Sequence, residues 1–224
     1  MRRQTILLAG SVVVMAMQID VISDVICPWC FIGKRRLEKA IAAHGGPVKV
    51  RWLPFQLNPT MPKEGISRRD YRTKKFGSWE RSLELDAQVA VAGQTEGIHF
   101  AFDRIERTPN TLDAHRLIWL ADKEGVQDAV VEALFVAYFT KGRDISDWQT
   151  LLDVVAEVGL DRNRAEAALN SNDGLEAITE AEGLSRRHRV DGVPFFIING
   201  KTTLGGAQPP EAFLAAFDQA VGSK

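Results

Sequence analysis

The chain is poor in cysteine, because only two occur among its 224 residues. Two thiols cannot form the framework of a disulfide-stapled domain, and they cannot supply a four-cysteine zinc or iron–sulfur site. The chain also lacks an excess of charge of one sign, since 28 basic residues oppose 29 acidic ones and leave a net charge of -1. Without a basic field, attraction to nucleic acid or to an anionic membrane surface is not expected.

No apolar run near the N-terminus is long enough to cross a bilayer as a helix, so we expect no stable membrane association. Residues 1–16 carry two arginines before a short apolar run, with Val14 and Ala16 where a signal peptidase prefers small residues. This segment is either a signal peptide, which implies a periplasmic protein, or an extension upstream of a start at Met15 or Met17. A strand-like segment follows Met17 at once. We therefore favour the extension and a cytoplasmic location.

The first 57 residues show the pattern strand, helix, strand. Residues 20–25 are a short β-branched run, and Val48, Val50 and Trp52 alternate with polar residues, as strands do. Apolar residues at helical spacing lie between these two strands, and Gly45-Gly46 predicts the end of the helix.

The pattern changes twice in the rest of the chain. Residues 64–189 repeat apolar side chains at helical spacing, whereas residues 195–198 are a buried-strand run. Asn199-Gly200 predicts a type I′ hairpin, and a last helix follows it. Without the helical block, the element order resembles the thioredoxin arrangement. The sequence therefore predicts a discontinuous thioredoxin-fold domain, residues 17–63 and 190–224, with residues 64–189 as an inserted helical domain.

The two cysteines lie three residues apart in Cys27–Cys30 (CPWC), where the first strand meets the first helix. A metal site would need two more ligands, and the four histidines are scattered without a metal-binding spacing, so no metal is expected. Inert buried thiols are a second interpretation. Redox chemistry explains the spacing better, because a helix N-terminus favours a thiolate at Cys27 and leaves Cys30 within reach of it.

The residues between the cysteines fit the same interpretation. Pro28 suits the first helical position. Trp29 offers a flat apolar surface to a substrate, or is simply a partly exposed packing residue. Far along the chain, Val193-Pro194 directly precedes the strand run. An X-Pro bond there is either an ordinary trans bond or a cis one. In the thioredoxin arrangement this loop faces the cysteines, so the backbone of Val193 would pair with an extended substrate.

Five segments together resemble one family. They are Ser23–Gly33, Pro54–Pro59, Lys75–Gly77, Pro109–Arg116 and Gly192–Phe196. They resemble the DsbA-like, FrnE-type group of dithiol–disulfide oxidoreductases, and the resemblance covers about residues 17–220.

This resemblance implies an α/β protein with a thioredoxin fold and an inserted all-helical domain. It implies Cys27 as the nucleophile, Cys30 as the resolving thiol and Pro194 as a cis proline. The expected partners are protein or small-molecule thiols and disulfides, with glutathione or a thioredoxin-type protein as redox partner. No cofactor is expected beyond glutathione as a co-substrate.

Two neighbouring groups provide the alternative function, a glutathione-dependent transferase or isomerase. Kappa-class glutathione transferases and 2-hydroxychromene-2-carboxylate isomerases share the architecture, but they carry serine in place of the first cysteine. A glutathione site is expected near Asn58, Asn110 and Val193, although Asn110 most simply caps the helix that starts at Thr111. A binding module or chaperone that uses an apolar groove is a third class.

The chain departs from thioredoxin and DsbA at one position. They have a buried acid six residues before the nucleophile, where this chain has Val21, flanked by Asp20 and Asp24. The usual internal proton acceptor is therefore not expected at this position. His115 is interpreted as a packed histidine rather than a ligand, and the basic stretch of residues 68–75 as a solvated helix face.

Overall fold

The structure is a computed structural model that describes residues 16–222. The predicted N-terminal extension or signal segment, residues 1–16, lies outside the described residues except for Ala16. Among residues 16–222, no helix has both the length and the apolar character needed to span a membrane.

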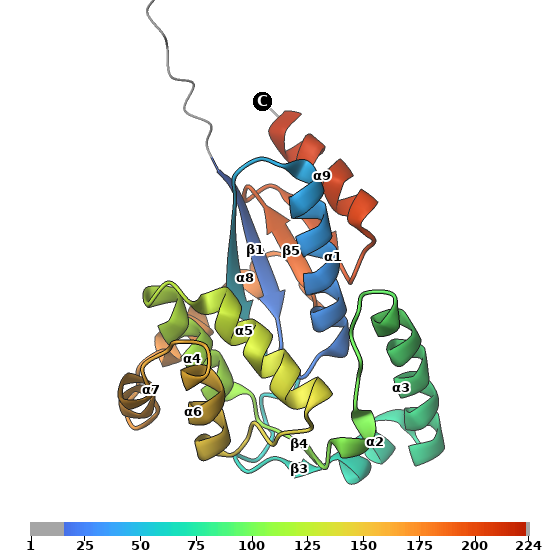
Figure 1. The fold of residues 1–224 in the computed structure, drawn as a ribbon, viewed down its shortest axis with the longest axis vertical. Helices are drawn as coiled ribbons and strands as arrows, with labels where there is room; N and C mark the ends of the chain where they lie inside the picture. Colours follow the sequence, from blue (N-terminus) through green and yellow to red (C-terminus); the bar gives the residue numbers. More distant parts are fainter. Residues whose placement is uncertain (1–15, 223–224) are drawn as a thin grey trace, which may run out of the picture.

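A four-stranded sheet with the order β2-β1-β5-β6 forms the upper part of the molecule (Figure 1). β1 (Met17–Ser23) lies parallel to β2 (Val48–Pro54) and antiparallel to β5 (Phe195–Ile198), which pairs with β6 (Thr202–Gly205). Asn199 and Gly200 join the last two strands with positive φ angles of 50° and 69°, as a type I′ turn requires. The predicted hairpin is confirmed.

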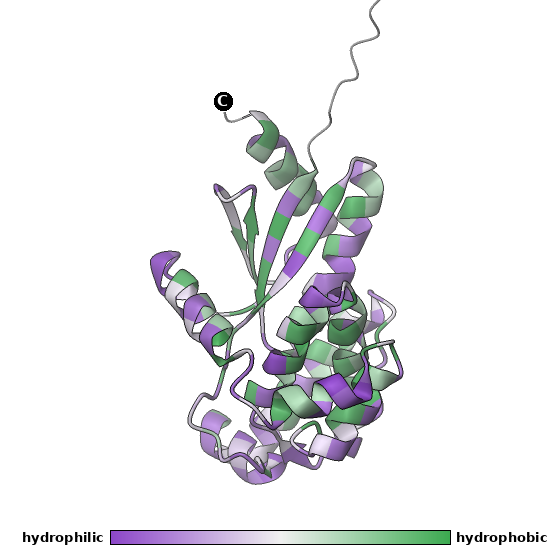
Figure 2. Cartoon of the chain, turned by 90° about the vertical axis from the view of Figure 1, so that its left-hand side faces the viewer, coloured by the Kyte–Doolittle hydropathy of each residue, from purple (hydrophilic) through white to green (hydrophobic). Residues whose placement is uncertain are grey.

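Helices cover both faces of the sheet. α1 (Pro28–His44) packs beside α9 (Pro210–Gly222), and α8 (Leu175–Arg187) contacts β2 from behind the sheet in Figure 1. Apolar and polar residues alternate along the two long strands in Figure 2, yet the C-terminal half of β1 is buried throughout. That is expected for a central strand with helices on both sides.

The inserted segment is mainly helical and forms the lower part of the molecule. Its helices are α2 (Arg68–Phe76), α3 (Trp79–Gln94), α4 (Leu112–Lys123), α5 (Gln127–Phe135), α6 (Trp148–Ala156) and α7 (Arg162–Leu169), followed by α8 behind the sheet. A 3₁₀ turn, Phe102–Arg104, and a π-helical turn, Val136–Thr140, also occur. The structure adds a two-residue ladder between β3 (Ile66–Ser67) and β4 (Arg107–Thr108). Strands this short leave no alternation that a sequence pattern could reveal.

α5 attaches the inserted helices to the sheet. The side-chain amide of Gln127 accepts from the Trp52 backbone N–H at 2.8 Å and donates to the Trp52 carbonyl at 3.0 Å, so it continues the edge of β2. Lys34 of α1 is buried and forms ion pairs with Asp128 and Glu132 at 3.1 and 3.3 Å. One contiguous hydrophobic cluster includes residues of the sheet and of the inserted helices. The division at residues 63/64 and 189/190 stays a prediction, and α8 contacts both β2 and α4.

Candidate active site

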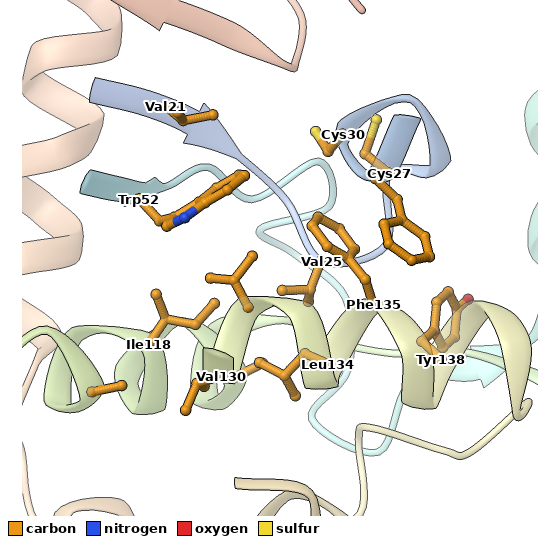
Figure 3. Packing of buried hydrophobic residues seen from close by; sticks show 14 of the residues in the cluster. Val21, Val25, Cys27, Cys30, Trp52, Ile118, Val130, Leu134, Phe135 and Tyr138 are labelled. Atoms are coloured by element: carbon orange, nitrogen blue, oxygen red, sulfur yellow. The ribbon is translucent and has the colours of Figure 1, made fainter. Parts of the chain in front are cut away.

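The loop after β1 places both cysteines at the N-terminus of α1. Cys27 is the N-cap residue with extended backbone angles, and its side chain makes no capping bond. Its N–H donates to the Asp24 carbonyl at 3.0 Å, and the Cys30 N–H donates to the Cys27 carbonyl at 3.0 Å. Both thiols are free, and Cys27 is 6% exposed while Cys30 is fully buried. Figure 3 shows the two sulfur atoms near each other above the helix α5.

Burial raises the pKa of the Cys30 thiol well above its ordinary value, and the neighbouring Cys27 raises it further. Hydrogen bonds from the Ser23 hydroxyl and the Asp24 backbone N–H act in the opposite direction, because they stabilise a thiolate. Cys30 therefore holds its proton at neutral pH. It must lose that proton before it can act as a nucleophile.

The loop before β5 lies directly against the first cysteine. The Val193–Pro194 peptide bond is cis, as the resemblance implies. The Cys27 thiol donates to the Val193 carbonyl, with 3.4 Å between Sγ and O. The Pro194 carbonyl accepts from the Gly206 N–H at 2.8 Å, which ties the loop to the end of β6. Segments 166 residues apart therefore meet at one thiol.

Gly33 makes this close approach possible. A Cβ atom at Gly33 would lie 3.0 Å from Pro194 Cγ and 3.3 Å from Phe196 Cζ. Both neighbours are buried, so the ring and the loop have little room to retreat.

We expect Gly33→Ala to destabilise the protein and to slow disulfide exchange. Overpacking costs about 2 kcal/mol, which exceeds the gain of about 1 kcal/mol in helix propensity. Displacement of the Pro194 loop also disturbs the contact to Cys27. Gly183→Ala is the matched control, because its Cβ would meet only the end of the Arg187 side chain, at 3.6 Å. Urea unfolding of both variants measures the difference, and a Gly33→Ala variant as stable as Gly183→Ala would contradict it.

A pocket of about 380 Å³ opens beside Cys27, between the start of α1 and the α2–α3 pair. Trp29 is 41% exposed and forms part of its wall. The pocket is lined mainly by apolar side chains, among them Ile26, Leu57, Phe76, Val89, Phe102 and Phe139. Figure 1 shows α2 and α3 set apart from the sheet, below the N-terminus of α1. The pocket can hold an apolar part of a substrate next to the reactive sulfur.

The basic stretch of residues 68–75 is only partly the solvated face that the sequence suggested. Arg68 is 4% exposed and pairs with Asp86 at 2.7 Å, and Arg72 pairs with the other oxygen of Asp86 at 2.7 Å. Burial lowers the pKa of Arg72 below its ordinary value. The negative charge of Asp86 raises this pKa, whereas the positive charge of Arg68 lowers it. Two cations on one carboxylate leave a net positive charge in the pocket wall. The prediction holds for Arg69, Lys74 and Lys75, which are exposed. It is wrong for Arg68 and Arg72, because their partner Asp86 lies on another helix.

The two asparagines that the sequence placed near a glutathione site have different environments. Asn58 lines the pocket, where its Oδ1 accepts from the Tyr71 hydroxyl at 2.6 Å and its buried Nδ2 has no partner. Asn110 accepts from the Leu112 N–H at 2.9 Å and donates to the Met61 carbonyl at 2.7 Å. The amide of Asn110 is therefore occupied at the start of α4, but the helix begins at Leu112 with Thr111 as its N-cap residue, one position later than the sequence predicted.

The two acids beside Val21 have different environments. Asp20 pairs with Arg51 at 2.9 Å near the surface. Asp24 is fully buried, accepts from the Leu57 N–H at 2.8 Å and lies 3.3 Å from His115 Nε2. The sequence alone did not distinguish these acids, and no local signal connects Asp24 with His115. Within residues 16–222, no cluster of three or more His, Cys, Asp or Glu side chains is arranged to hold a metal.

Comparison with known proteins identifies the family of this chain. The model of the family described as "DSBA-like thioredoxin domain" matches residues 18–218. The chain is 28% identical to the uncharacterized protein YwbO of Bacillus subtilis over 204 residues, which are 91% of this chain and 96% of that protein.

Two solved structures are also similar. A probable DsbA oxidoreductase from Streptomyces coelicolor has a TM-score of 0.87 at 30% identity, over 93% of this chain and 91% of that one. The cytosolic disulfide reductase DsbM from Pseudomonas aeruginosa, solved with GSH, has a TM-score of 0.60 at 21% identity, over 91% and 95% of the two chains.

The fold and the paired thiols are those of a thioredoxin-fold, DsbA-like oxidoreductase with a CxxC arrangement. This chain belongs to the DSBA-like thioredoxin domain family. The fold class and the family predicted from the sequence are thus confirmed.

Proposed function

We propose that this protein is a FrnE-type thiol–disulfide oxidoreductase that exchanges disulfides through Cys27 and Cys30. The observation that carries this proposal is the contact of Cys27 with the Val193 carbonyl at the rim of an apolar pocket, with Cys30 buried one turn inside the helix. A substrate disulfide in the pocket meets the more accessible sulfur first.

The reaction proceeds in two displacements. The Cys27 thiolate attacks one sulfur of the substrate disulfide, a Cys27–substrate disulfide forms, and the other substrate sulfur leaves as a thiolate. The deprotonated Cys30 then attacks Cys27 Sγ, the Cys27–Cys30 disulfide forms, and the remaining substrate sulfur leaves as a thiolate. The substrate gains two electrons and the enzyme loses two. Two glutathione thiols, or one dithiol of a thioredoxin-type protein, then reduce the Cys27–Cys30 disulfide and leave as a disulfide themselves. The reverse sequence oxidises a substrate.

We propose protein or small-molecule disulfides as substrates, with glutathione as a co-substrate and the cytoplasm as the location. The unpaired Nδ2 of Asn58 supplies a hydrogen-bond donor for a peptide carbonyl. Arg68 and Arg72 share the single carboxylate of Asp86, and their net positive charge supplies a cationic wall for a carboxylate. The DsbM structure with GSH supports this only as a likeness of fold. The periplasm is the alternative location if residues 1–16 direct export, and cell fractionation distinguishes the two.

Reduction of insulin by dithiothreitol tests the function. The protein is expected to accelerate the reaction, and Cys27→Ala to give the uncatalysed rate. Equilibration of the Cys27–Cys30 pair in glutathione buffers gives its reduction potential, and hence the favoured direction of exchange in a given compartment. A protein that conjugates glutathione to an electrophile, but leaves insulin unreduced, would support the transferase alternative and contradict this proposal.

A further inference from the structure

The proposed exchange leaves one proton unaccounted for. Cys30 is fully buried at 0% exposure, away from solvent that could take its proton. Position 21, where thioredoxin-like proteins carry an acid, holds the fully buried Val21. If the proposed function holds, another group must take the proton of Cys30.

His115 presents an unused base in the buried region behind the cysteines. Its side chain is 2% exposed, and its Nε2 lies 3.2 Å from the Phe55 carbonyl. A carbonyl oxygen can only accept, so Nε2 carries the hydrogen. Nδ1 of the neutral ring is therefore a free base. It is buried and has no hydrogen-bond partner in the protein.

Asp24 is placed to support a positive charge on this ring. Its Oδ2 accepts from the Leu57 N–H at 2.8 Å, which fixes the carboxylate. Its Oδ1 lies 3.3 Å from His115 Nε2 and makes no hydrogen bond of its own. A carboxylate at this distance in a buried setting stabilises an imidazolium.

A small cavity lies between this ring and Ser23. It offers about 10 Å³ to the centre of a water molecule, which is room for about one water. His115 and Ser23 both line it, together with Trp52 and apolar side chains. The Trp52 indole N–H is already bound to Asp128 at 2.9 Å, so Ser23 and His115 are the polar groups left for a water. The Ser23 side chain also acts on the Cys30 thiol, whose pKa it lowers against the effect of burial.

We propose that His115 Nδ1 accepts the proton of Cys30 through the Ser23 hydroxyl and one water molecule in this cavity, with Asp24 stabilising the imidazolium. The Cys30 S–H bond breaks as Ser23 Oγ receives the proton. Ser23 passes its own proton to the water, and the water passes one to Nδ1. Cys30 is then a thiolate that attacks Cys27 Sγ. When the enzyme is reduced again, Cys30 leaves as a thiolate and regains the proton from His115.

The other ionisable groups near this path are bound to other partners or stay neutral. Cys27 faces Cys30 and is tied up in the mixed disulfide when the proton moves. Asp128 is held by Trp52 and Lys34. The Tyr138 hydroxyl donates to the Arg107 carbonyl. Burial raises the pKa of Tyr138 well above its ordinary value, and the negative charge of Asp24 raises it further, so Tyr138 stays neutral. Arg116, next in sequence, binds carbonyl groups of residues 168–173 on the far side of α4.

The test follows the two displacements separately. Reduced full-length protein is mixed in a stopped-flow instrument with a symmetric aromatic disulfide that releases a coloured thiolate. The first equivalent of colour reports attack by Cys27, and the second reports attack by Cys30 on the mixed disulfide. His115→Gln removes the base, because its amide reaches the Nε2 position and still donates to Phe55. His99→Gln, at an exposed histidine, is the matched control.

We expect His115→Gln to slow the second phase by about 10²-fold at neutral pH, as loss of a general base does, and to change the first phase by less than about 2-fold. The deficit should shrink as pH rises, because hydroxide then removes the Cys30 proton directly. Ser23→Ala should give the same pattern, which keeps the test decisive if His115→Gln folds poorly.

Three results would overturn the proposal. They are a second phase of His115→Gln at the wild-type rate, a deficit that is equal at every pH, and a Ser23→Ala variant with normal resolution. Failure of the proposed function looks different, because the wild-type protein itself would then release no second equivalent.

Discussion

Cys30→Ser is expected to convert the protein into a trap for its own substrates. Cys27 remains able to attack a disulfide, since it is the more exposed sulfur and faces the Val193 carbonyl at the pocket rim. Serine has no thiol to displace it, so the mixed disulfide persists until an external thiol arrives. We expect catalytic turnover of insulin to fall by at least about 10³-fold, as for loss of a catalytic nucleophile. Non-reducing gels and mass spectrometry should show substrate attached to Cys27.

Cys27→Ser is the matched control, because it makes the same change three residues away. It should lose turnover to the same extent but trap nothing, since buried Cys30 holds its proton and is shielded from substrate. The opposite pattern, with substrate trapped on Cys30 in Cys27→Ser and none on Cys27 in Cys30→Ser, would reverse the roles assigned to the two thiols.

The features that the sequence predicted well are those with a local signature. Cys27–Cys30 at a strand–helix junction, and Asn199-Gly200 between two apolar runs, are short patterns whose chemistry fixes the local backbone. The role of Pro194 cannot be predicted from its neighbours alone, since it depends on the order of helices and strands along the whole chain. That order was sufficient, and the structure places Val193 against Cys27.

The features that the sequence did not reveal depend on partners far along the chain. Arg68 resembles any exposed helical arginine until Asp86, on the next helix, approaches to 2.7 Å. Asp24 and His115 are separated by 91 positions, and each alone has an ordinary explanation, a loop acid and a packed histidine. Polar and apolar residues recur with a regular period only where one face of a helix or strand is uniformly buried or uniformly exposed. A buried polar pair interrupts that pattern without indicating its partner.

The largest effect on stability is expected from Phe135→Ala. Phe135 ends α5, is fully buried and stacks on Phe31 of α1 with ring centroids 5.1 Å apart at 12°. It also meets the Trp52 ring of β2 edge-on at 6.4 Å. Figure 3 shows the side chain pointing from α5 toward the loop that carries the cysteines. Removing the ring leaves a cavity between the inserted helices and the thioredoxin part, at a cost of about 3–5 kcal/mol.

Phe135 also tests whether the inserted helices and the sheet unfold together. One contiguous cluster contains Phe31, Trp52 and Phe135, so we expect one cooperative transition that shifts as a whole in Phe135→Ala. Phe76→Ala, at a half-buried pocket residue on α2, should cost clearly less. Calorimetry and urea unfolding followed by circular dichroism measure both variants. If wild type showed two separated transitions, and Phe135→Ala moved only one of them, residues 64–189 would be an independent folding unit. The packing across α1 and α5 would then contribute to the stability of that unit alone.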